Sequence, residues 1–470
     1  MLPRSLSEWL GLLQQRHPTE IELGLSRVGR VARDLQCLSP AKNTVTITGT
    51  NGKGSCVAAL QALLMDQGYR VGCYTSPHLI DYNERIVIQG EQASDEAICQ
   101  AFQRIEEARG DTSLTYFEFG TLAALILMSE AELDVAILEV GLGGRLDAVN
   151  IVDAGIAIVT SIALDHQDWL GDDLDRIGAE KAAIARPGRP LLCGDDFPVE
   201  GIVRTAADIG ATLLVNDRDF SLGQFQSVPD HRLPANSVAC ALQATHMITG
   251  LPASDISTQP LSLVQVPGRF QEASVAGVPV ILDVAHNPQA AGLLAERLVP
   301  QKGRLLAVVG MMADKDIIGT LQPMIPLVRA WFPCSIPEQL RAATEGNIEA
   351  LLYNAGAAAN GEVYCCSSPL SAFEKALQHA GEGDRVVVFG SFFTVGPILE
   401  HIQSSREGMA CADRKCKTEN CRWFCPVGIA AYFICRAVRL LRFAPSRHHQ
   451  PYSTQAGDRA SYRSRTPAPG

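Results

Sequence analysis

Short apolar runs alternate with longer segments of helical periodicity along most of this chain. Residues 44–48 combine β-branched and apolar side chains, which predicts a short buried strand. Residues 55–67 carry apolar side chains three and four positions apart, which predicts an amphipathic helix that ends before Gly68. Residues 70–74 return to a strand pattern. A strand, a loop, a helix and a second strand in this order begin an α/β sheet.

The same alternation continues along the chain and starts again after residues 266–271. The first half contains predicted helices at residues 96–108, 119–129, 174–185 and 236–248, and predicted strands at residues 135–140, 155–161, 191–192 and 211–215. Asn236 is expected to cap the last of these helices. The second half contains predicted strands at residues 279–284, 304–310 and 385–390, and predicted helices at residues 288–298 and 369–379. The pattern therefore predicts two α/β units.

Composition restricts the classes of protein to which the chain can belong. Of its 470 residues, 47% are hydrophobic and 19% are charged, and the net charge of −11 gives no support to nucleic-acid binding. No run of about 20 apolar residues occurs, so we expect no membrane span. The first residues lack a basic region followed by an apolar stretch, so we expect no secretory signal. Nine of the 14 cysteines are scattered through the first 405 residues, which favours reduced thiols and a cytoplasmic protein.

The last 65 residues differ from the rest of the chain. From Arg406 onward there are 12 Lys and Arg against 4 Asp and Glu, together with five cysteines. Four of those cysteines have C-x₄-C-x₄-C-x₃-C spacing, which fits a zinc site poorly. No helix or strand period persists, so residues 406–470 are expected to form a disordered tail.

The segment GTNGKGS at residues 49–55 lies between the first predicted strand and the first predicted helix. Its glycines allow backbone N–H groups to face an anion, and the following helix adds a partial positive charge. Lys53 supplies a mobile cation for phosphates, and Ser55 offers a hydroxyl to phosphate or Mg²⁺. The loop is shorter than a regular Walker A motif, and a glycine separates Lys53 from Ser55. The alternative is a structural turn with an exposed lysine.

With this loop in place, the two units define the expected architecture. We expect an α/β fold with a P-loop-type ATPase domain at residues 1–270, built on a mostly parallel sheet. A smaller Rossmann-like α/β domain is expected at residues 271–405. A cleft between two open sheets is the expected ligand site.

Six further stretches follow the loop in a fixed order: SPHL with YNERI (76–86), TYFEF (115–119), EVGLGGRLDAVN (139–150), EKAAI (180–184), PGRFQ (267–271) and DVAHNP (283–288). Together with TGTNGKGS they resemble the bacterial bifunctional dihydrofolate synthase/folylpolyglutamate synthase family of the Mur ligase superfamily. The resemblance extends from about residue 5 to about residue 405.

This resemblance implies an ATP-dependent ligase. ATP would phosphorylate a carboxylate of dihydropteroate or of a reduced folate, and the amine of L-glutamate would attack the resulting acyl phosphate. Phosphate is a far better leaving group than a carboxylate oxygen, which is why ATP makes the substitution possible. The resemblance also implies Mg²⁺, at two sites, and a monomeric enzyme. Residues 1–270 would then bind ATP and folate, and residues 271–405 would form the glutamate ligase domain.

Two residues that follow predicted strands offer metal ligands. Glu139 lies at the sheet edge where open α/β sheets bind ligands, and Mg²⁺ prefers oxygen ligands. The alternative for Glu139 is a structural glutamate held by backbone N–H groups. The alternative for His166, which also follows a predicted strand, is a structural histidine. The resemblance implies metal ligation by the following residues: Ser55, Ser76, Glu139, His166 and Lys181.

Lys181 in EKAAI would, by its pattern alone, be a salt-bridged or solvated lysine on a helix face. The resemblance implies instead that CO₂ carbamylates its amine, which turns a cation into a carboxylate that can hold a second Mg²⁺. Carbamylation requires an unprotonated amine and hence a lowered pKa. The family usually has EKAGI here, but the lysine itself is intact. Whether K⁺ assists is left open.

The resemblance assigns the remaining residues to ATP, catalysis and the folate acceptor. Residues expected to bind ATP are Gly49, Thr50, Asn51, Gly52, Lys53, Gly54, Ser55, Asn236, Arg269 and Asp283. Residues expected to be catalytic are Lys53, Lys181, Asp283 and His286. Residues expected to contact the acceptor are Glu22, Leu23, Gly24, Leu25, His78, Thr115, Tyr116, Phe117, Glu118, Arg145 and Asp147. Without the resemblance, Arg269 would be read as a linker salt bridge, DVAHNP as a capped turn and the acceptor stretches as core.

Two other functions are compatible with a phosphate loop. A peptidoglycan-precursor amino-acid ligase belongs to the same superfamily, but SPHL, YNERI and TYFEF argue against it. A nucleotide-dependent switch is the alternative from a different class, and such a protein would not need both EKAAI and DVAHNP.

Overall fold

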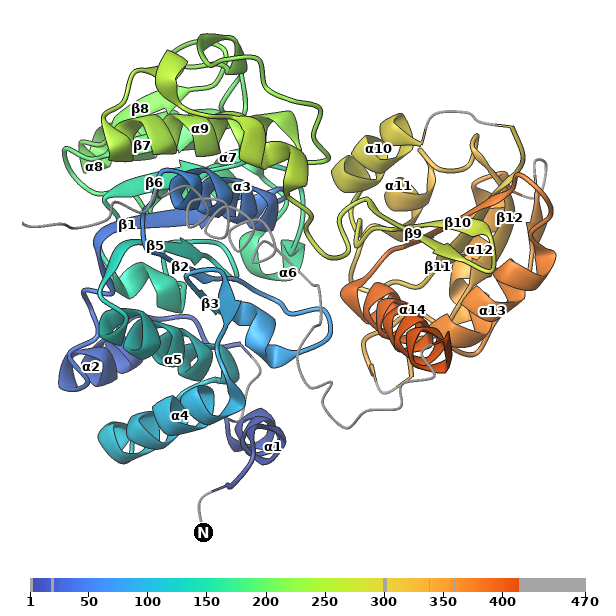
Figure 1. Ribbon diagram of the computed structural model, residues 1–470, viewed down its shortest axis with the longest axis horizontal. Helices are drawn as coiled ribbons and strands as arrows, with labels where there is room; N and C mark the ends of the chain where they lie inside the picture. Colours follow the sequence, from blue (N-terminus) through green and yellow to red (C-terminus); the bar gives the residue numbers. More distant parts are fainter. Residues whose placement is uncertain (1–2, 18–20, 299–301, 338, 358–360, 414–470) are drawn as a thin grey trace, which may run out of the picture. The chain divides into compact units, whose positions relative to one another are not determined.

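The structure is a computed structural model that describes residues 3–17, 21–298, 302–337, 339–357 and 361–413. These residues form two sheets, each with helices on both faces, within one compact unit of the chain (Figure 1). The predicted α/β class is confirmed. The prediction for residues 414–470 lies outside the described residues.

The first sheet has eight strands, and its central strands are parallel. Six strands run in parallel in the order β2, β5, β1, β6, β7 and β8, and the short strands β3 and β4 extend the β2 edge in antiparallel fashion. Central strands such as β1 are buried on both faces because helices cover both sides of the sheet. The bounds are β1 Ala41–Thr48, β2 Val71–Tyr74, β3 Ile86–Ile88, β4 Glu91–Gln92, β5 Leu133–Glu139, β6 Ile156–Val159, β7 Pro190–Cys193 and β8 Thr212–Val215.

Two helices, α3 (Lys53–Asp66) and α9 (Ala235–Thr249), pack together on one face of this sheet. Other helices contribute to the separate core on the opposite face. They are α1 Leu6–Arg16, α2 Ser26–Asp34, α4 Asp95–Arg109, α5 Tyr116–Glu130, α7 Leu174–Ala182 and α8 Glu200–Ile209, and the short α6 (Gln167–Leu170) precedes α7. This arrangement places the start of α3 at the carboxyl edge of the parallel strands.

The second sheet has six strands in the order β13, β12, β11, β14, β10 and β9. Its strands are β9 Gln271–Val275, β10 Val278–Leu282, β11 Leu305–Val309, β12 Val328–Pro333, β13 Glu362–Val363 and β14 Arg385–Phe389. One core contains α10 (Pro288–Arg297), α11 (Ile317–Leu321) and α12 (Glu345–Asn354), and the core on the other face contains α13 (Pro369–His379) and α14 (Phe392–Asp413). Of the described strands in this sheet, β9 alone runs antiparallel to its neighbour, β10. The two strands are joined by a tight turn at Ala276 and Gly277, which both have positive φ.

One helix start was predicted wrongly. Asn236 does not cap α9, because Pro234 occupies the N-cap position and the helix begins at Ala235. The Asn236 side chain donates instead to Thr160 O, at 2.9 Å, in the loop after β6. The side-chain amide that the local pattern assigned to the start of α9 therefore forms a hydrogen bond with a distant segment instead.

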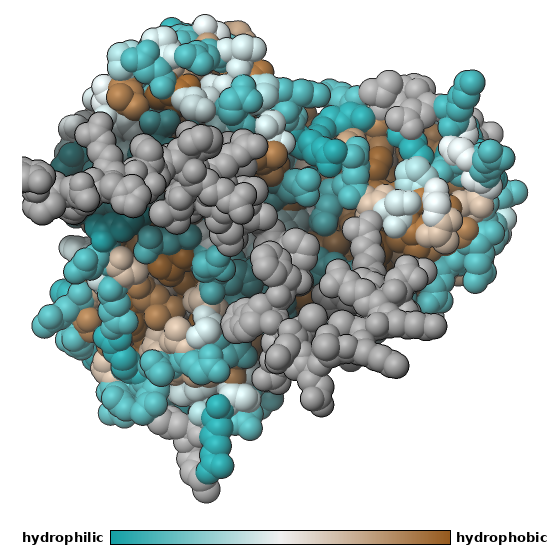
Figure 2. Space-filling view, viewed as in Figure 1, coloured by the Kyte–Doolittle hydropathy of each residue, from teal (hydrophilic) through white to brown (hydrophobic). Residues whose placement is uncertain are grey.

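The exposed face drawn in Figure 2 is mostly hydrophilic, with hydrophobic residues in separate groups on both domains. The most exposed large apolar side chains, Phe197 and Leu340, lie in loops rather than on helix faces. Within the described ranges, no helix is long and apolar enough to cross a membrane.

Helix α14 continues past the predicted domain boundary at residue 405 to Asp413, so residues 406–413 are helical and do not belong to a disordered tail as predicted. Among the side chains of α14 that the structure describes, the buried apolar ones are Val395, Ile398, Leu399 and Ile402. A chain that ends after Gln403 keeps all four. We therefore expect its melting temperature to lie within about 4 °C of that of the full chain, the shift that ~1 kcal/mol produces. Differential scanning calorimetry of the two chains checks this, and a larger decrease would mean that later residues stabilise the fold.

Candidate functional site

The loop at residues 49–55 joins β1 to α3 and is packed too tightly for additional side chains. A Cβ atom on Gly49 would lie 2.0 Å from Thr160 Oγ1, and one on Gly52 would lie 2.4 Å from Ser237 Oγ. Gly52 is also the N-cap of α3, with a φ of 86° that favours glycine. In the part of the chain that the structure describes, no side chain caps this helix start. The backbone N–H groups there form the kind of site that binds phosphate.

Two lysine amines meet at this loop. Lys53 Nζ donates to Gly49 O at 2.9 Å and to Thr50 O at 3.3 Å, and Lys181 Nζ donates to Gly49 O at 3.3 Å. Burial lowers the pKa of both amines, and the charge of Lys53 contributes to lowering the pKa of Lys181 to about 7. Lys181 is therefore a buried amine at the phosphate loop and not the solvated lysine that its helical pattern allowed.

Glu139 ends β5 as a buried carboxylate that is 4% exposed. It accepts a hydrogen bond from the backbone N–H of Ser76 at 3.2 Å, and it forms no ion pair with a basic side chain of the described residues. Burial raises its pKa, while the positive charge of Lys53 opposes the rise. A Cβ on Gly54 would lie 3.9 Å from Glu139 Oε2, so the carboxylate borders the start of α3, where Ser55 lies. A desolvated carboxylate that is near cations but paired directly with none of them fits a divalent metal ion.

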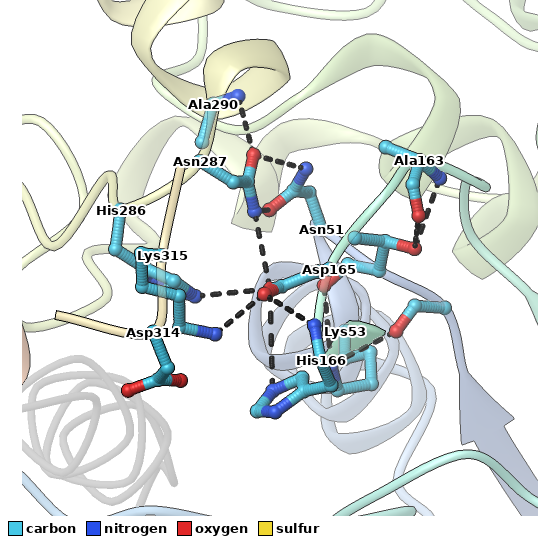
Figure 3. A network of polar contacts seen from close by, with 12 residues as sticks. Asn51, Lys53, Ala163, Asp165, His166, His286, Asn287, Ala290, Asp314 and Lys315 are labelled. Atoms are coloured by element: carbon cyan, nitrogen blue, oxygen red, sulfur yellow. Dashed lines mark hydrogen bonds and ion pairs between the residues drawn. The ribbon is translucent and has the colours of Figure 1, made fainter. Parts of the chain in front are cut away.

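His166 is the N-cap residue of α6, with a φ of 52°. Its side chain is 42% exposed, and the burial of the rest of the ring lowers its pKa to about 4 despite the nearby charge of Asp165. Lys53 also lowers this pKa, and Figure 3 shows the imidazole close to that lysine. A neutral imidazole is the form that binds metal ions, so His166 fits the predicted role as a ligand.

The linker between the sheets contributes Arg269, whose guanidinium carbon lies 5.1 Å from the centre of the Phe392 ring. Asp283 follows β10 and accepts hydrogen bonds from the N–H groups of Phe270 and Ala285, both at 2.8 Å. Burial lowers the pKa of Arg269, while the charges of Asp283 and Glu139 oppose the change. Arg269 is therefore close enough to carboxylates from both sheets to be affected electrostatically by each.

Sequence reasoning missed the residue that connects these two edges. Asp165 contacts His286, Asn287 and Lys315 of the second sheet (Figure 3). Asn287 also exchanges hydrogen bonds with Asn51 of the phosphate loop. The one available signal was position, because Asp165 and Lys315 each follow a parallel strand by a few residues, as the predicted site residues do; nothing in either stretch indicates the partner.

The segments predicted to bind the acceptor are far apart in the sequence, but the fold brings them together. Arg27 forms ion pairs with Glu22 and with Glu118, the second at an N–O distance of 3.1 Å. Gly24 N donates to Leu146 O at 3.2 Å, which places residues 22–25 beside the GGRLD loop. Thr115 and Glu118 form a capping box at the start of α5.

An aromatic ring lies near these segments. A Cβ on Gly141 would lie 2.7 Å from the ring of Phe117, so the ring covers the loop after β5. The Phe117 and Tyr74 rings are 6.0 Å apart, and the Tyr116 ring packs edge-on against Tyr82 at 5.8 Å.

Three expected acceptor residues have protein partners. Asp147 accepts hydrogen bonds from the backbone N–H groups of Gly141, Leu142 and Val149, and therefore holds its own loop. Burial raises the pKa of Asp147 to about 6. Arg145 donates to Glu180 at 2.9 Å. His78 accepts from Arg85 at 2.8 Å. The acceptor role of these three residues stays a prediction.

The chain is similar to known proteins over both sheets. The family described as "Mur ligase middle domain" matches residues 47–190, and the family described as "Mur ligase, glutamate ligase domain" matches residues 268–392. The dihydrofolate synthase/folylpolyglutamate synthase of Escherichia coli (strain K12) is 44% identical over 419 residues, which cover 86% of this chain and 97% of that protein. The chain belongs to the dihydrofolate synthase/folylpolyglutamate synthase family of Mur ligases.

Solved structures of this Mur ligase family share the fold. Escherichia coli FolC in complex with DHPP and ADP superposes with a TM-score of 0.79 at 42% identity, covering 86% of this chain and 99% of that one. A bifunctional folylpolyglutamate synthase/dihydrofolate synthase with Mn, AMPPNP and L-glutamate bound also has a TM-score of 0.79, at 43% identity over 85% of this chain and 98% of that one.

The matched Mur ligase segments contain most of the site. The middle-domain segment includes Lys53, Glu139 and Lys181, and the ligase-domain segment includes Asp283 and Lys315. The predicted recognition is therefore confirmed.

Proposed function

We propose that this protein is an ATP-dependent ligase that adds L-glutamate to dihydropteroate, giving dihydrofolate, and to reduced folates, giving folylpolyglutamates. The single observation that carries the proposal is the meeting of two halves of a site. The phosphate loop, with Lys53 and Lys181, is joined through Asn51 to Asn287 in the loop that also carries Asp283. The DHPP, ADP, AMPPNP and L-glutamate bound to relatives support the same substrates here.

The residues of the phosphate loop act on ATP first. The N–H groups at the start of α3 and the Lys53 ammonium neutralise the β- and γ-phosphates. A carboxylate oxygen of the acceptor attacks the γ-phosphorus, the bond to ADP breaks, and an acyl phosphate forms. The amine of L-glutamate then attacks the acyl carbon, phosphate leaves with the bonding electrons, and the amine loses a proton as the amide forms.

A divalent metal ion, when bound, supplies positive charge to the phosphate oxygens. Glu139, Ser76 and His166 would hold it, with Ser55 on the same side of the loop. A carbamylated Lys181 would supply a carboxylate for a second ion, and K⁺ is a further candidate cofactor. The burial of Glu139 at the start of α3, without a direct ion pair among the described residues, supports the first of these sites.

The acceptor would bind beside the capping box at the start of α5. Phe117 offers a flat face to a heteroaromatic ring, and the charged group formed by Glu22, Arg27 and Glu118 borders the same region. The proposal includes residues 1–270 as the ATP- and folate-binding domain and residues 271–405 as the glutamate ligase domain. It also includes a monomeric enzyme that works in the cytoplasm.

The proposal is tested by ADP release. Purified protein with ATP and Mg²⁺ is expected to release ADP only when dihydropteroate and L-glutamate are both present, and reduced folate is expected to replace dihydropteroate. Each substrate omitted singly is the control, and mass spectrometry should find one added glutamate per ADP. Release that depends on a muramyl nucleotide would indicate a peptidoglycan-precursor ligase, and release without any acceptor would indicate a nucleotide switch.

A further inference from the structure

Asp165 is the point at which the second sheet contacts the loop after β6. Its carboxylate lies 2.5 Å from Lys315 Nζ and 3.3 Å from His286 Nε2, and it accepts a hydrogen bond from Asn287 Nδ2 at 3.4 Å. The side chain is only 6% exposed. All three of these partners lie in loops that follow strands β10 and β11 of the second sheet, and Figure 3 shows them converging on the one carboxylate.

The charge of this carboxylate makes the contact specific. A buried carboxylate is strongly disfavoured unless cations and hydrogen-bond donors replace the water that it has lost. Lys315 supplies the cation, and its side chain is itself only 10% exposed. Because both partners are desolvated, removal of the charge of one of them by mutation would leave the other charge buried and unpaired, which is strongly destabilising.

The partners of Asp165 lie in the loop that carries the proposed catalytic groups. His286 and Asn287 come within four residues of Asp283, and Asn287 is also the N-cap of α10. Asn287 and Asn51 exchange two side-chain hydrogen bonds, at 3.0 and 3.1 Å. The side chain of Asn287 is therefore bonded both to Asp165 and to Asn51 of the phosphate loop.

We infer that Asp165 is a positioning residue of the ligase reaction: through Lys315 and His286 it fixes the DVAHNP loop at the distance from the phosphate loop that the transfer to glutamate requires. The inference rests on the proposed function. Asp165 acts through other residues, and it also accepts a hydrogen bond from the backbone N–H of His166 at 2.8 Å. A catalytic loop displaced by about 1 Å loses on the order of 100-fold in rate.

The kinetic test compares Asp165→Asn with Lys315→Met, which keep the size of each side chain and remove its charge. Each variant is expected to lower kcat for glutamate addition about 10- to 100-fold and to leave the Kd for AMPPNP, measured by calorimetry, within about threefold. The kcat of the double variant is expected to lie within about threefold of that of the less active single variant, because both substitutions remove the same contact between Asp165 and Lys315. Losses in kcat that multiply in the double variant would overturn the inference.

Hydrogen exchange supplies the readout that a local structural defect would not move. In Asp165→Asn, peptides covering residues 283–290 and 311–317 are expected to exchange faster, although they lie more than 100 positions away in sequence. Asp168→Asn is the matched control, because it removes the same charge from an exposed position in α6, three residues away, and should change neither kcat nor exchange. Unchanged exchange in the distant peptides of Asp165→Asn would overturn the inference.

Misfolding of a variant and failure of the proposed function can each be distinguished from failure of the inference. If Asp165→Asn does not fold, Lys315→Met tests the same contact from the other sheet, with faster exchange then expected at residues 161–167. If the wild-type protein shows no glutamate-dependent ADP release, the proposed function fails, and acceleration of exchange in the distant peptides still decides whether Asp165 holds the two loops together.

Discussion

The Lys53→Ala variant is expected to lose ATP turnover by about 1,000-fold while it remains folded. Lys53 Nζ lies at the start of α3, within 2.9 Å of Gly49 O, where the phosphates of a bound nucleotide would meet the loop. Removing a single preorganised group that stabilises developing charge costs about 100- to 1,000-fold in rate. The loss should appear in kcat for ADP release with both substrates saturating.

Folding of this variant should be intact, because burial lowers the pKa of Lys53 and the charged amine therefore destabilises the protein where it lies. The melting temperature is expected to be unchanged or higher. Lys42→Ala is the control, since Lys42 is an exposed lysine paired with Asp134 at the start of β1. ADP release within tenfold of wild type in Lys53→Ala would contradict the role assigned to the loop.

The Lys181→Ala variant is expected to lose about 100- to 1,000-fold in kcat and to recover part of that loss when a small carboxylic acid such as acetate is added. The reason is the proposed carbamate, whose two oxygens acetate can imitate in the space that the lysine leaves. A recovery of at least about tenfold, equivalent to ~1.4 kcal/mol, is expected. Acetate should have no such effect on Lys53→Ala, which is the matched control. Absence of recovery at any acetate concentration would count against the carbamate.

The lowered pKa of Lys181 predicts that carbamate formation at this residue depends on pH. Burial and the charge of Lys53 lower the pKa of Lys181 to about 7, so the ammonium form predominates below that pH and the neutral amine above it. Only the neutral amine combines with CO₂. At a fixed concentration of dissolved ¹³CO₂, the carbamate NMR signal should be weak at pH 6 and near its maximum at pH 8. An ordinary lysine, with a pKa of about 10.4, would still be gaining signal above pH 9. Lys181→Ala should lack the signal.

Local patterns predicted the elements that local physics controls. The apolar periodicity of residues 55–67 predicted α3, which the structure places at Lys53–Asp66, and the helix at residues 369–379 was predicted with the bounds of α13. The glycines of the phosphate loop were also predictable, because a positive φ and a close neighbour each exclude other residues. Short strands such as β13 were missed, since two residues carry no detectable period.

Interactions between distant segments were beyond the reach of those patterns. Asn236 was expected to cap α9, but its amide bonds to Thr160, 76 positions earlier. Asp165 was not singled out, because its Lys315 partner lies 150 positions away and the charge of either residue alone resembles an ordinary surface charge.

The sequence by itself determined which residue types occupy the phosphate loop, which segments form strands and helices, and to which family the chain is related, because these depend on neighbouring residues and on ordered motifs. Only the tertiary structure decided that Lys181 is a buried amine on Gly49 O, 132 positions away, and that Asp165 joins the two sheets. The physical reason is desolvation: whether a charged side chain is an exposed solubilising group or a reactive buried one depends on which distant segments remove its water and replace it with partners.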